Sequence, residues 1–409
     1  MPNRKKIFLI ISLLYIVYTI FPLFSDIVHL PVWLPSLLSF IVILLLYPKA
    51  FLNRTVYWFI AYAGVLFIYF LGRHPLAIGI GSVGDAKKLL IEYAYILPTI
   101  SIFSVLIYLN DFKLTQLLIN LSIVILFASF VVVIPLLNQY GSIREALGEV
   151  EDFYVPGLPG YSLMHAYTLF LPSLCYASKY LKSKEKLLYL FLLIVLCFVV
   201  IDTYVTTSLV IMIMVLVLSM VYSERHRNIL GIVLALLFVI AFFCYEFGVF
   251  SFLVDLLLPF FRGTAVESKL VDLQSTLSGN HIGRSDMQLR IQLHLRSLNS
   301  FFASPFFGRP DIGNHSALLD RLGGMGLVAT FPFVMIIVSY FISAKRLFRT
   351  PSAKAFFMMG VIVGLVYLYE KSLWGSESWL FYMVLMPMSL WIYENRVHPL
   401  DNLDITNHM

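Results

Sequence analysis

Charged residues are scarce in this chain. Asp, Glu, Lys and Arg make up 13% of its 409 residues, whereas hydrophobic residues make up 60%. A soluble domain is about a quarter charged. With a mean hydropathy of +0.88, the composition excludes an ordinary soluble protein and predicts an all-α polytopic membrane protein. The net charge of +6 does not indicate nucleic-acid binding, because the basic residues are scattered among loops.

Cysteine is also rare, and nucleotide and metal motifs are absent. Cys175, Cys197 and Cys244 all lie in apolar runs without metal-ligand spacing, which predicts free thiols in the core. The sequence contains no G-x-x-x-x-G-K-[ST] motif, so nothing in it suggests the use of ATP. No cluster of His, Cys and carboxylate residues has the spacing of a metal site. We therefore expect neither a cofactor nor a metal.

Long apolar runs dominate the remaining sequence. Because a helix needs about 20 residues to cross a bilayer, we expect about twelve spans in a single transmembrane domain, residues 1–409. Gly360 and Gly364, in the eleventh run, form a G-x-x-x-G pattern that predicts a close helix contact. A long loop, residues 249–320, separates the ninth and tenth runs. The runs lie near 7–24, 32–47, 55–72, 89–109, 115–137, 161–178, 187–203, 205–222, 229–248, 321–343, 355–373 and 379–394.

The distribution of Lys and Arg predicts the orientation. The N-terminus has a basic start and an apolar run without a small-residue cleavage site, which indicates an uncleaved first span. With Arg4, Lys5 and Lys6 inside, the short inside loops hold more than half of the 29 basic residues, as the positive-inside rule requires. Both termini are then cytoplasmic, and the loop 249–320 is external.

Most of the notable polar residues gather between Gly283 and Gly326. Arg290 and His294 are four residues apart and share a face if the segment is helical. A neighbouring apolar stripe predicts a basic amphipathic helix at the membrane surface. Pro305 and the following glycines should end that helix. The stripe consists of Ile291, Leu295, Leu298 and Phe302.

Two further features flank this stretch. His315 precedes a span expected to start near Leu318, and the positive end of that helix disfavours a charged imidazole. A neutral imidazole can accept a proton. The alternative is that His315 is a capping or packing residue. Glu370 and Lys371, at the end of the eleventh span, either anchor the membrane interface or face the same external cavity.

These residues resemble the Wzy-type O-antigen polymerases and the related O-antigen ligases. The shared pattern is an arginine, a helix, Pro-x-x-Gly, a His-Ser pair with a following Asp, and a glycine that enters the next span. In this chain the pattern corresponds to Arg290, Pro305 to Gly308, Asn314-His315-Ser316, Leu319-Asp320 and Gly326-Leu327.

The resemblance implies a C-type membrane glycosyltransferase in the bacterial inner membrane, with an outward, periplasmic active site. Its donor would be an undecaprenyl-pyrophosphate-linked glycan, and its acceptor a sugar hydroxyl on another lipid-linked repeat unit. Arg290 would bind the pyrophosphate, which suits the planar guanidinium, and His315 would serve the acceptor hydroxyl. Other candidates for binding pyrophosphate or glycan are Arg284, His294, Arg309, Asp320 and Arg321.

One departure concerns the second phosphate contact. The family often has a Ser-Arg pair at the outer start of an earlier span, where this chain has Thr206-Thr207-Ser208-Leu209. A second arginine must therefore come from elsewhere. Arg284 is the first choice, followed by Arg73, Arg144, Arg309 and Arg321.

Three functions are weighed. The first is a polymerase of surface polysaccharide, favoured by the Ser and Asp that follow the histidine. The second is a ligase that transfers the finished glycan to a lipid A core. The third is a transporter or flippase, which would distribute ionisable residues through its spans. The expected partners are the lipid-linked donor and acceptor, membrane lipid, and a chain-length regulator and flippase of the same pathway, without nucleic acid.

Overall fold

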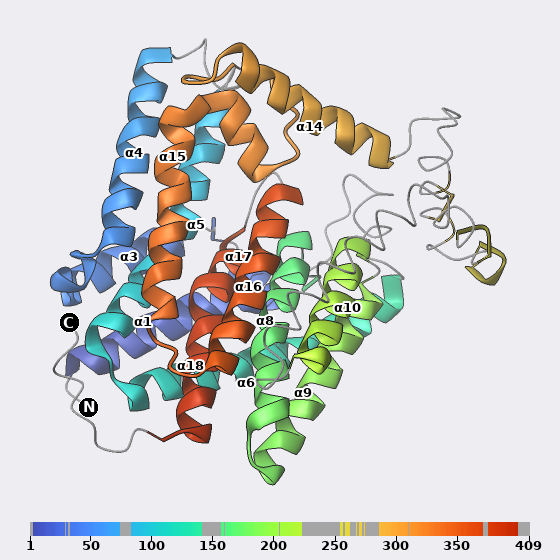
Figure 1. Ribbon diagram of the computed structural model, residues 1–409. Helices are drawn as coiled ribbons and strands as arrows, with labels where there is room; N and C mark the ends of the chain where they lie inside the picture. The colour runs from blue at the N-terminus through green and yellow to red at the C-terminus, as the bar shows by residue number, and fades with distance from the viewer. Residues whose placement is uncertain are drawn as a thin grey trace.

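A computed structural model describes residues 3–73, 83–140, 157–222, 286–370 and 375–399, except positions 29, 32, 159, 204 and 310, with short stretches between 254 and 274. The regular elements in these residues are helices, with no strand among them, which confirms the all-α prediction for this part of the chain. Figure 1 shows the helices gathered in one bundle, with one helix lying across its upper end. The expected ninth span, 229–248, and the loop from 275 to 285 lie outside the described residues.

The long helices follow the predicted apolar runs. Each begins and ends near the run from which it was predicted, because those runs are bounded by Pro, Gly, Asn or charged residues. The bounds are α1 Asn3–Ile20, α2 Pro22–Val28, α3 Trp33–Leu46, η1 Pro48–Phe51, α4 Arg54–Arg73, α5 Val83–Leu109, α6 Phe112–Tyr140, α8 Tyr161–Tyr180, α9 Ser183–Asp202, α10 Thr206–Val221, η3 Leu258–Phe261, α14 Asp286–Ala303, α15 Ala317–Lys345, α16 Pro351–Glu370, α17 Ser376–Leu380, the π-helix η4 Phe381–Leu385 and α18 Met386–Val397.

Three of these helices are long and apolar enough to cross a membrane: Phe112–Gln139, Ala317–Lys345 and Pro351–Glu370. The α1–α2 pair could add a fourth, and shorter apolar helices cover Trp33–Leu46, Arg54–Ile68, Ile96–Leu109 and Thr207–Val221. The membrane-protein prediction is thus supported by helix length and composition. The number of twelve spans and the external placement of the long loop stay predictions.

The first predicted span, 7–24, differs from the structure. α1 ends at Ile20, and α2 starts at Pro22 with its axis turned by 98°. Proline has no N–H to continue the helical ladder, and it disfavours helical geometry in the preceding Phe21. The chain therefore turns sharply where the hydropathy pattern alone predicts a continuous helix.

α8 lies in the middle of the bundle. Its buried residues run without interruption from Leu163 to Ala177, which is the pattern of a helix packed on all sides. It packs against α9, α10, α16 and α18 (Figure 1). Cys175 of this helix and Cys197 of α9 are free thiols, as predicted, whereas Cys244 lies outside the described residues.

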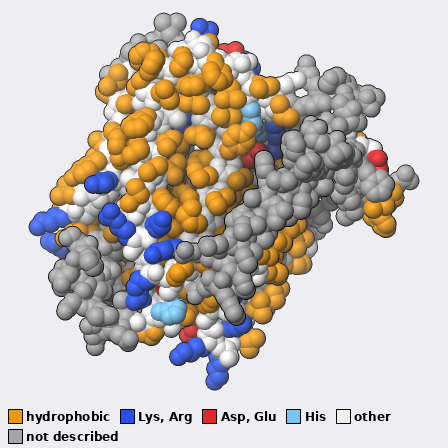
Figure 2. All heavy atoms as spheres, in the orientation of Figure 1, with side chains coloured by type: hydrophobic (Ala, Val, Ile, Leu, Met, Phe, Trp, Pro, Cys, Tyr) orange, Lys and Arg blue, Asp and Glu red, His pale blue; other side chains and the backbone are white. Residues whose placement is uncertain are grey.

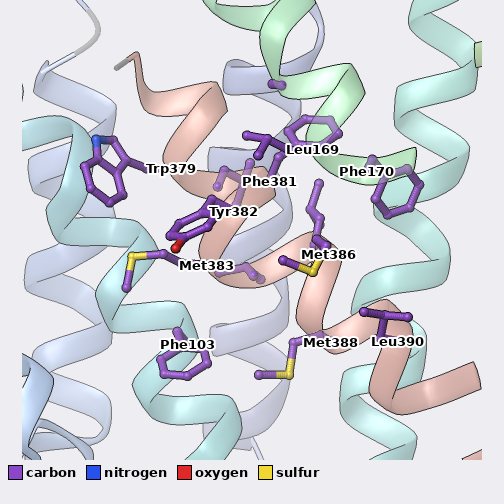
Figure 3. Packing of buried hydrophobic residues seen from close by; sticks show 14 of the residues in the cluster. Phe103, Leu169, Phe170, Trp379, Phe381, Tyr382, Met383, Met386, Met388 and Leu390 are labelled. Atoms are coloured by element: carbon purple, nitrogen blue, oxygen red, sulfur yellow. The ribbon is translucent and has the colours of Figure 1, made fainter. Parts of the chain in front are cut away.

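The C-terminal helix changes register where it meets α8 and α16. Figure 3 shows Phe381 on the side of Leu169 and Phe170 of α8, whereas Tyr382 points away from them, toward Trp379. Pro387 has no N–H to donate to a carbonyl of the preceding turn. The carbonyl of Tyr382 instead accepts a hydrogen bond from Tyr340 Oη at 2.7 Å. A π-turn at such a register change needs an external donor, and α15 provides it.

The predicted G-x-x-x-G contact is present. A Cβ added to Gly360 would lie closer than 3.0 Å to Met386, and one added to Gly364 would lie closer than 3.0 Å to Tyr382. Both glycines therefore permit α16 to approach the C-terminal helix at a distance that a side chain would prevent.

α15 is broken near its start by a turn of the preceding loop. Gly326 has φ 65° and ψ −167°, which no helix residue adopts. At this break Leu327 N donates to Pro305 O at 2.8 Å, and Val328 N donates to Phe306 O at 3.2 Å. The loop thus satisfies backbone groups that a broken membrane helix would leave unpaired, at a cost of several kcal/mol each.

Glycines make this contact possible. Gly308 also has a positive φ, 69°. A Cβ on Gly308 would lie closer than 3.0 Å to the backbone of Gly324, and a Cβ on Gly326 would lie closer than 3.0 Å to the backbone of Phe306. The two backbones touch directly, so the loop after α14 and the start of α15 form one rigid unit.

The end of the bundle opposite α14 is basic. Figure 2 shows Lys and Arg side chains gathered over the lower part of the visible face, below a broad apolar surface. Ion pairs join the helices there: Lys5 Nζ lies 2.5 Å from Asp111 Oδ2, and Arg396 Nη1 lies 3.6 Å from Glu185 Oε1. These contacts tie α1 to the start of α6 and α18 to the start of α9.

Candidate functional site

The candidate site lies where α14 meets the end of α16. Arg290 and His294 are one turn apart on α14, and both face α16. Arg290 Nη1 lies 3.9 Å from Glu370 Oε2, and the His294 ring centroid lies 5.0 Å from that of Tyr369. The prediction that Arg290 and His294 share a helix face is confirmed. Glu370, at the end of α16, lies beside Arg290.

His315 completes the cluster from the loop before α15. Its ring centroid lies 5.6 Å from that of His294. The two imidazoles are 21 positions apart in the sequence, and the tight turn after α14 brings them together. His315 is not the cap of α15, because the Ser316 side chain caps that helix by accepting from Leu319 N at 3.1 Å. Its ring is half-buried between α14 and the loop.

Asp320 fixes the loop that carries His315. Its Oδ1 accepts from Ser297 Oγ at 2.6 Å, and its Oδ2 accepts from Ser316 N at 2.8 Å. Ser297 Oγ in turn accepts from Gly313 N at 2.9 Å. This carboxylate, predicted to bind substrate, is therefore engaged on both oxygens with α14 and the loop.

The same packing excludes side chains at two glycines. A Cβ on Gly313 would lie closer than 3.0 Å to the backbone of Leu293, and one on Gly323 closer than 3.0 Å to the carbonyl oxygen of Ser297. α14 thus packs on the loop and on α15 at backbone distance, and the imidazoles keep a fixed separation.

Arg321 lies apart from the two imidazoles. It is 5% exposed. Its Nε donates to Tyr62 Oη of α4 at 2.9 Å, and its Nη1 donates to Ala317 O at 2.5 Å. Its guanidinium also lies 4.3 Å from the Phe333 ring centroid. These contacts direct Arg321 to α4, on a different side of α15 from α16.

The remaining predicted arginines have different positions. Arg309 is exposed, and its backbone N donates to Gly323 O at 2.8 Å. Arg296 forms an exposed ion pair with Asp311. Arg284 and Arg144, and the side chain of Arg73, lie outside the described residues. The structure therefore brings together Arg290, His294 and His315. Asp320 holds the loop that carries His315, whereas Arg321 is directed toward α4.

A buried polar cluster lies one helical turn further into the bundle. His165 Nδ1 is 2.9 Å from Ser208 Oγ, and the His165 ring centroid is 4.6 Å from that of Tyr367. Tyr367 Oη is also 2.6 Å from Thr168 Oγ1. Polar groups among apolar helices form strong interhelical contacts, and this cluster joins α8, α10 and α16 below Glu370.

A second polar contact joins α8 to the C-terminal helix. Ser162 Oγ donates to Glu377 Oε2 at 3.0 Å, and Ser378 Oγ donates to Ser162 O at 3.1 Å. Sequence reasoning did not identify either cluster as a contact. A histidine within an apolar run is a signal in itself, but the sequence does not show that His165, Ser208 and Tyr367 meet.

Among the described residues, no group of three His, Cys, Asp or Glu side chains is placed to hold a metal ion. No model of a known protein family matches the chain, and no curated protein matches it.

Proposed function

We propose that this chain is a glycosyltransferase that joins undecaprenyl-pyrophosphate-linked oligosaccharide repeat units into a surface polysaccharide, at the outer face of the bacterial inner membrane. The observation that carries the proposal is the convergence of Arg290, His294 and His315 at the end of α16. Arg290 and His315 are the residues on which the resemblance to the O-antigen polymerases mainly rests. Arg290 lies beside the end of α16, a helix long and apolar enough to cross a membrane, and His315 reaches the same place through its contact with His294.

The distribution of charge supports this orientation. At the basic end, Lys5 at the start of α1 pairs with Asp111 just before α6, and Arg396 near the end of α18 pairs with Glu185 at the start of α9. Arg349, just after α15, donates to Asn395 near the end of α18. The cluster of Arg290 and the two histidines lies at the start of α15 and the end of α16, at the other end of the bundle (Figure 1). Because basic loops stay in the cytoplasm, the cluster would face the outside, where lipid-linked repeat units are joined.

The proposed reaction uses two groups. The acceptor hydroxyl attacks the anomeric carbon of the donor sugar, the bond from that carbon to the pyrophosphate oxygen breaks, and its electrons stay on the pyrophosphate. Arg290 stabilises this leaving group with paired N–H donors. His315 accepts the proton that the acceptor hydroxyl loses, while His294, between them, contacts the bound substrate.

The surrounding residues would position these two groups. Asp320 and Ser297 hold the His315 loop, so we assign Asp320 a positioning role in place of direct substrate binding. Arg321 is buried against Tyr62 and would stabilise α15 against α4. Arg309, exposed in the loop, and Arg284 stay candidates for the second phosphate contact.

The structure weakens one argument for a polymerase over a ligase. Ser316 and Asp320, the residues that favour the polymerase in the sequence, are engaged in capping α15 and fixing the loop. Both enzymes need a fixed histidine, so this geometry supports their shared chemistry. A transporter would place ionisable groups along a path through the spans, whereas the cluster of Arg290, His294 and His315 lies at one end.

Deletion of the gene, followed by gel analysis of the surface glycan, tests the proposed function. A single repeat unit on the lipid core indicates the polymerase, long chains unattached to core indicate the ligase, and loss of all translocated units indicates a flippase. Either of the last two patterns would contradict the proposal.

Complementation of the deletion strain with Arg290 variants tests the site. We expect Arg290→Ala to accumulate normally and give no polymer. Arg290→Lys should also be poor, because an ammonium cannot make paired contacts with phosphate oxygens. Arg296→Ala is the matched control, since Arg296 lies on the same helix in an exposed ion pair with Asp311. Wild-type chain lengths from Arg290→Lys would contradict the phosphate role.

A further inference from the structure

Arg290 is paired with a carboxylate that lies beyond hydrogen-bonding distance. Its Nη1 lies 3.9 Å from Glu370 Oε2, with the two side chains 37% and 29% exposed. A charge-assisted hydrogen bond between such groups is about 2.7–2.9 Å long. The two charges therefore attract each other without a hydrogen bond, and the guanidinium N–H groups are not donated to this carboxylate.

Two other arginines of the described chain are held by hydrogen bonds. Arg349 Nη2 donates to Asn395 Oδ1 at 2.7 Å and to His398 O at 2.8 Å. Arg321 donates to Tyr62 Oη and Ala317 O. Arg290, by contrast, has a carboxylate close enough to balance its charge but does not donate a hydrogen bond to it.

The position of Glu370 gives it this role. Glu370 is the last residue of α16, where the helix carbonyls add partial negative charge beside the guanidinium. The preceding residue, Tyr369, packs on His294. Tyr367, three residues before Glu370, is hydrogen-bonded to Thr168. α16 therefore holds the carboxylate at a set distance from α14.

We propose that Glu370 is an internal anion that occupies the face of Arg290 in the empty site, and that the pyrophosphate of the donor displaces it. This inference rests on the proposed function and adds a residue that lowers the affinity of Arg290 for every anion by a common factor. A ligand that interacts weakly with the guanidinium therefore does not displace the carboxylate at ordinary concentrations. A pyrophosphate carries more charge and several oxygens that fit the guanidinium fork, so it replaces Glu370 at a net gain.

The displacement of Glu370 from Arg290 can be measured with inorganic pyrophosphate and inorganic phosphate as probes. The experiment is calorimetric titration of the purified, detergent-solubilised full chain at low ionic strength. In Glu370→Gln we expect pyrophosphate to bind roughly two- to fivefold more tightly, the range that corresponds to an exposed ion pair. Phosphate binding should tighten by a similar factor, because each ligand that displaces Glu370 is then spared the same cost. Glu370→Asp should keep the wild-type affinities.

The control is Asp311→Asn, which removes the carboxylate of the exposed pair with Arg296 on the same helix and should leave both affinities unchanged. Unchanged or weaker pyrophosphate binding in Glu370→Gln would overturn the inference, provided that thermal unfolding shows an intact fold. Arg290→Ala separates the two proposals. If Arg290→Ala binds pyrophosphate like the wild type, the proposed site itself fails. If Arg290→Ala loses binding but Glu370→Gln does not tighten it, only the role of Glu370 fails.

Discussion

The two ends of the bundle hold their charges in different ways. At the basic end, Lys5 donates to Asp111 at 2.5 Å, and the buried Glu394 accepts from Arg349 N at 2.9 Å and Thr350 N at 2.6 Å. At the end with α14, Arg290 stays 3.9 Å from its carboxylate. These charges at the basic end are committed to joining helices, whereas Arg290 at the α14 end is positioned but still available to a ligand.

Rigidity at the α14 end comes from the backbone. The Pro305–Gly308 turn and the start of α15 are joined through main-chain hydrogen bonds and glycine contacts. Because the backbone holds this region together, its side chains are not all needed for packing. Arg290, His294 and His315 can therefore be directed to a shared site. The comparison predicts that glycine substitutions damage the α14 end most, that site substitutions remove activity alone, and that substitutions at the basic end change only stability.

The largest effect is expected from Gly326→Ala and Gly308→Ala. Each adds a Cβ closer than 3.0 Å to backbone atoms at a residue with positive φ. We expect each variant to lose at least about 3 kcal/mol of stability and to accumulate poorly. The measurement is thermal unfolding of the detergent-solubilised protein, together with the amount of polymer formed in cells.

Gly64→Ala is the matched control for these variants. Gly64 lies in α4, and a Cβ there would meet nothing within 4 Å. Alanine favours a helix over glycine by up to about 1 kcal/mol, so this variant should keep or raise the unfolding temperature. A Gly326→Ala protein as stable as Gly64→Ala would contradict the backbone contact between the loop and α15.

The next effect concerns the two imidazoles. If His315 accepts the proton of the acceptor hydroxyl, His315→Ala should lower turnover by at least about a hundredfold. His315→Gln should recover little, because an amide can orient a hydroxyl but cannot take its proton. The measurement is turnover by purified protein on lipid-linked repeat units, with unfolding temperatures recorded for each variant.

His294→Gln provides the comparison, because His294 lies next to His315 but is fixed on α14. We expect a smaller loss, mainly in substrate affinity. Turnover that survives in His315→Ala but not in His294→Ala would make His294 the proton acceptor. Near-wild-type turnover in both alanine variants would leave the pair as packing residues and remove the acid–base part of the mechanism.

Much of the fold could be predicted from the sequence. Apolar runs gave the helix positions, because Pro and Gly mark where a backbone ladder stops. The sharp turn at Phe21 and Pro22 was missed, since a hydropathy window averages across a single proline. The break at Gly326 was also missed, because the donor and acceptor groups that make it stable come from a loop about 20 residues earlier.

The site was predictable only as residue types. Helical spacing placed Arg290 and His294 on one face, which the structure confirms. The functions assigned to Asp320 and Arg321 depended on which way each side chain points, and that is decided by Ser297 and Tyr62, on other elements. Contacts between distant helices do not leave a local pattern that one sequence can show.

The smallest expected effect lies at the basic end, where loss of an ion pair should lower stability in a pH-dependent way without changing turnover near neutral pH. The hydrogen bond from Lys5, opposed by partial burial, lowers the pKa of Asp111 below its usual 3.8. The stabilisation is therefore complete above that ordinary value and is lost as pH falls through the lower, folded pKa. Asp111→Asn keeps an acceptor for Leu114 N but loses the charge, so it should lower stability by at most about 1 kcal/mol near neutral pH. The gap in unfolding temperature between Asp111→Asn and wild type should narrow as pH falls below 3.8, the ordinary Asp value, with turnover near neutral pH unchanged. A gap independent of pH would show that the ion pair does not stabilise this end.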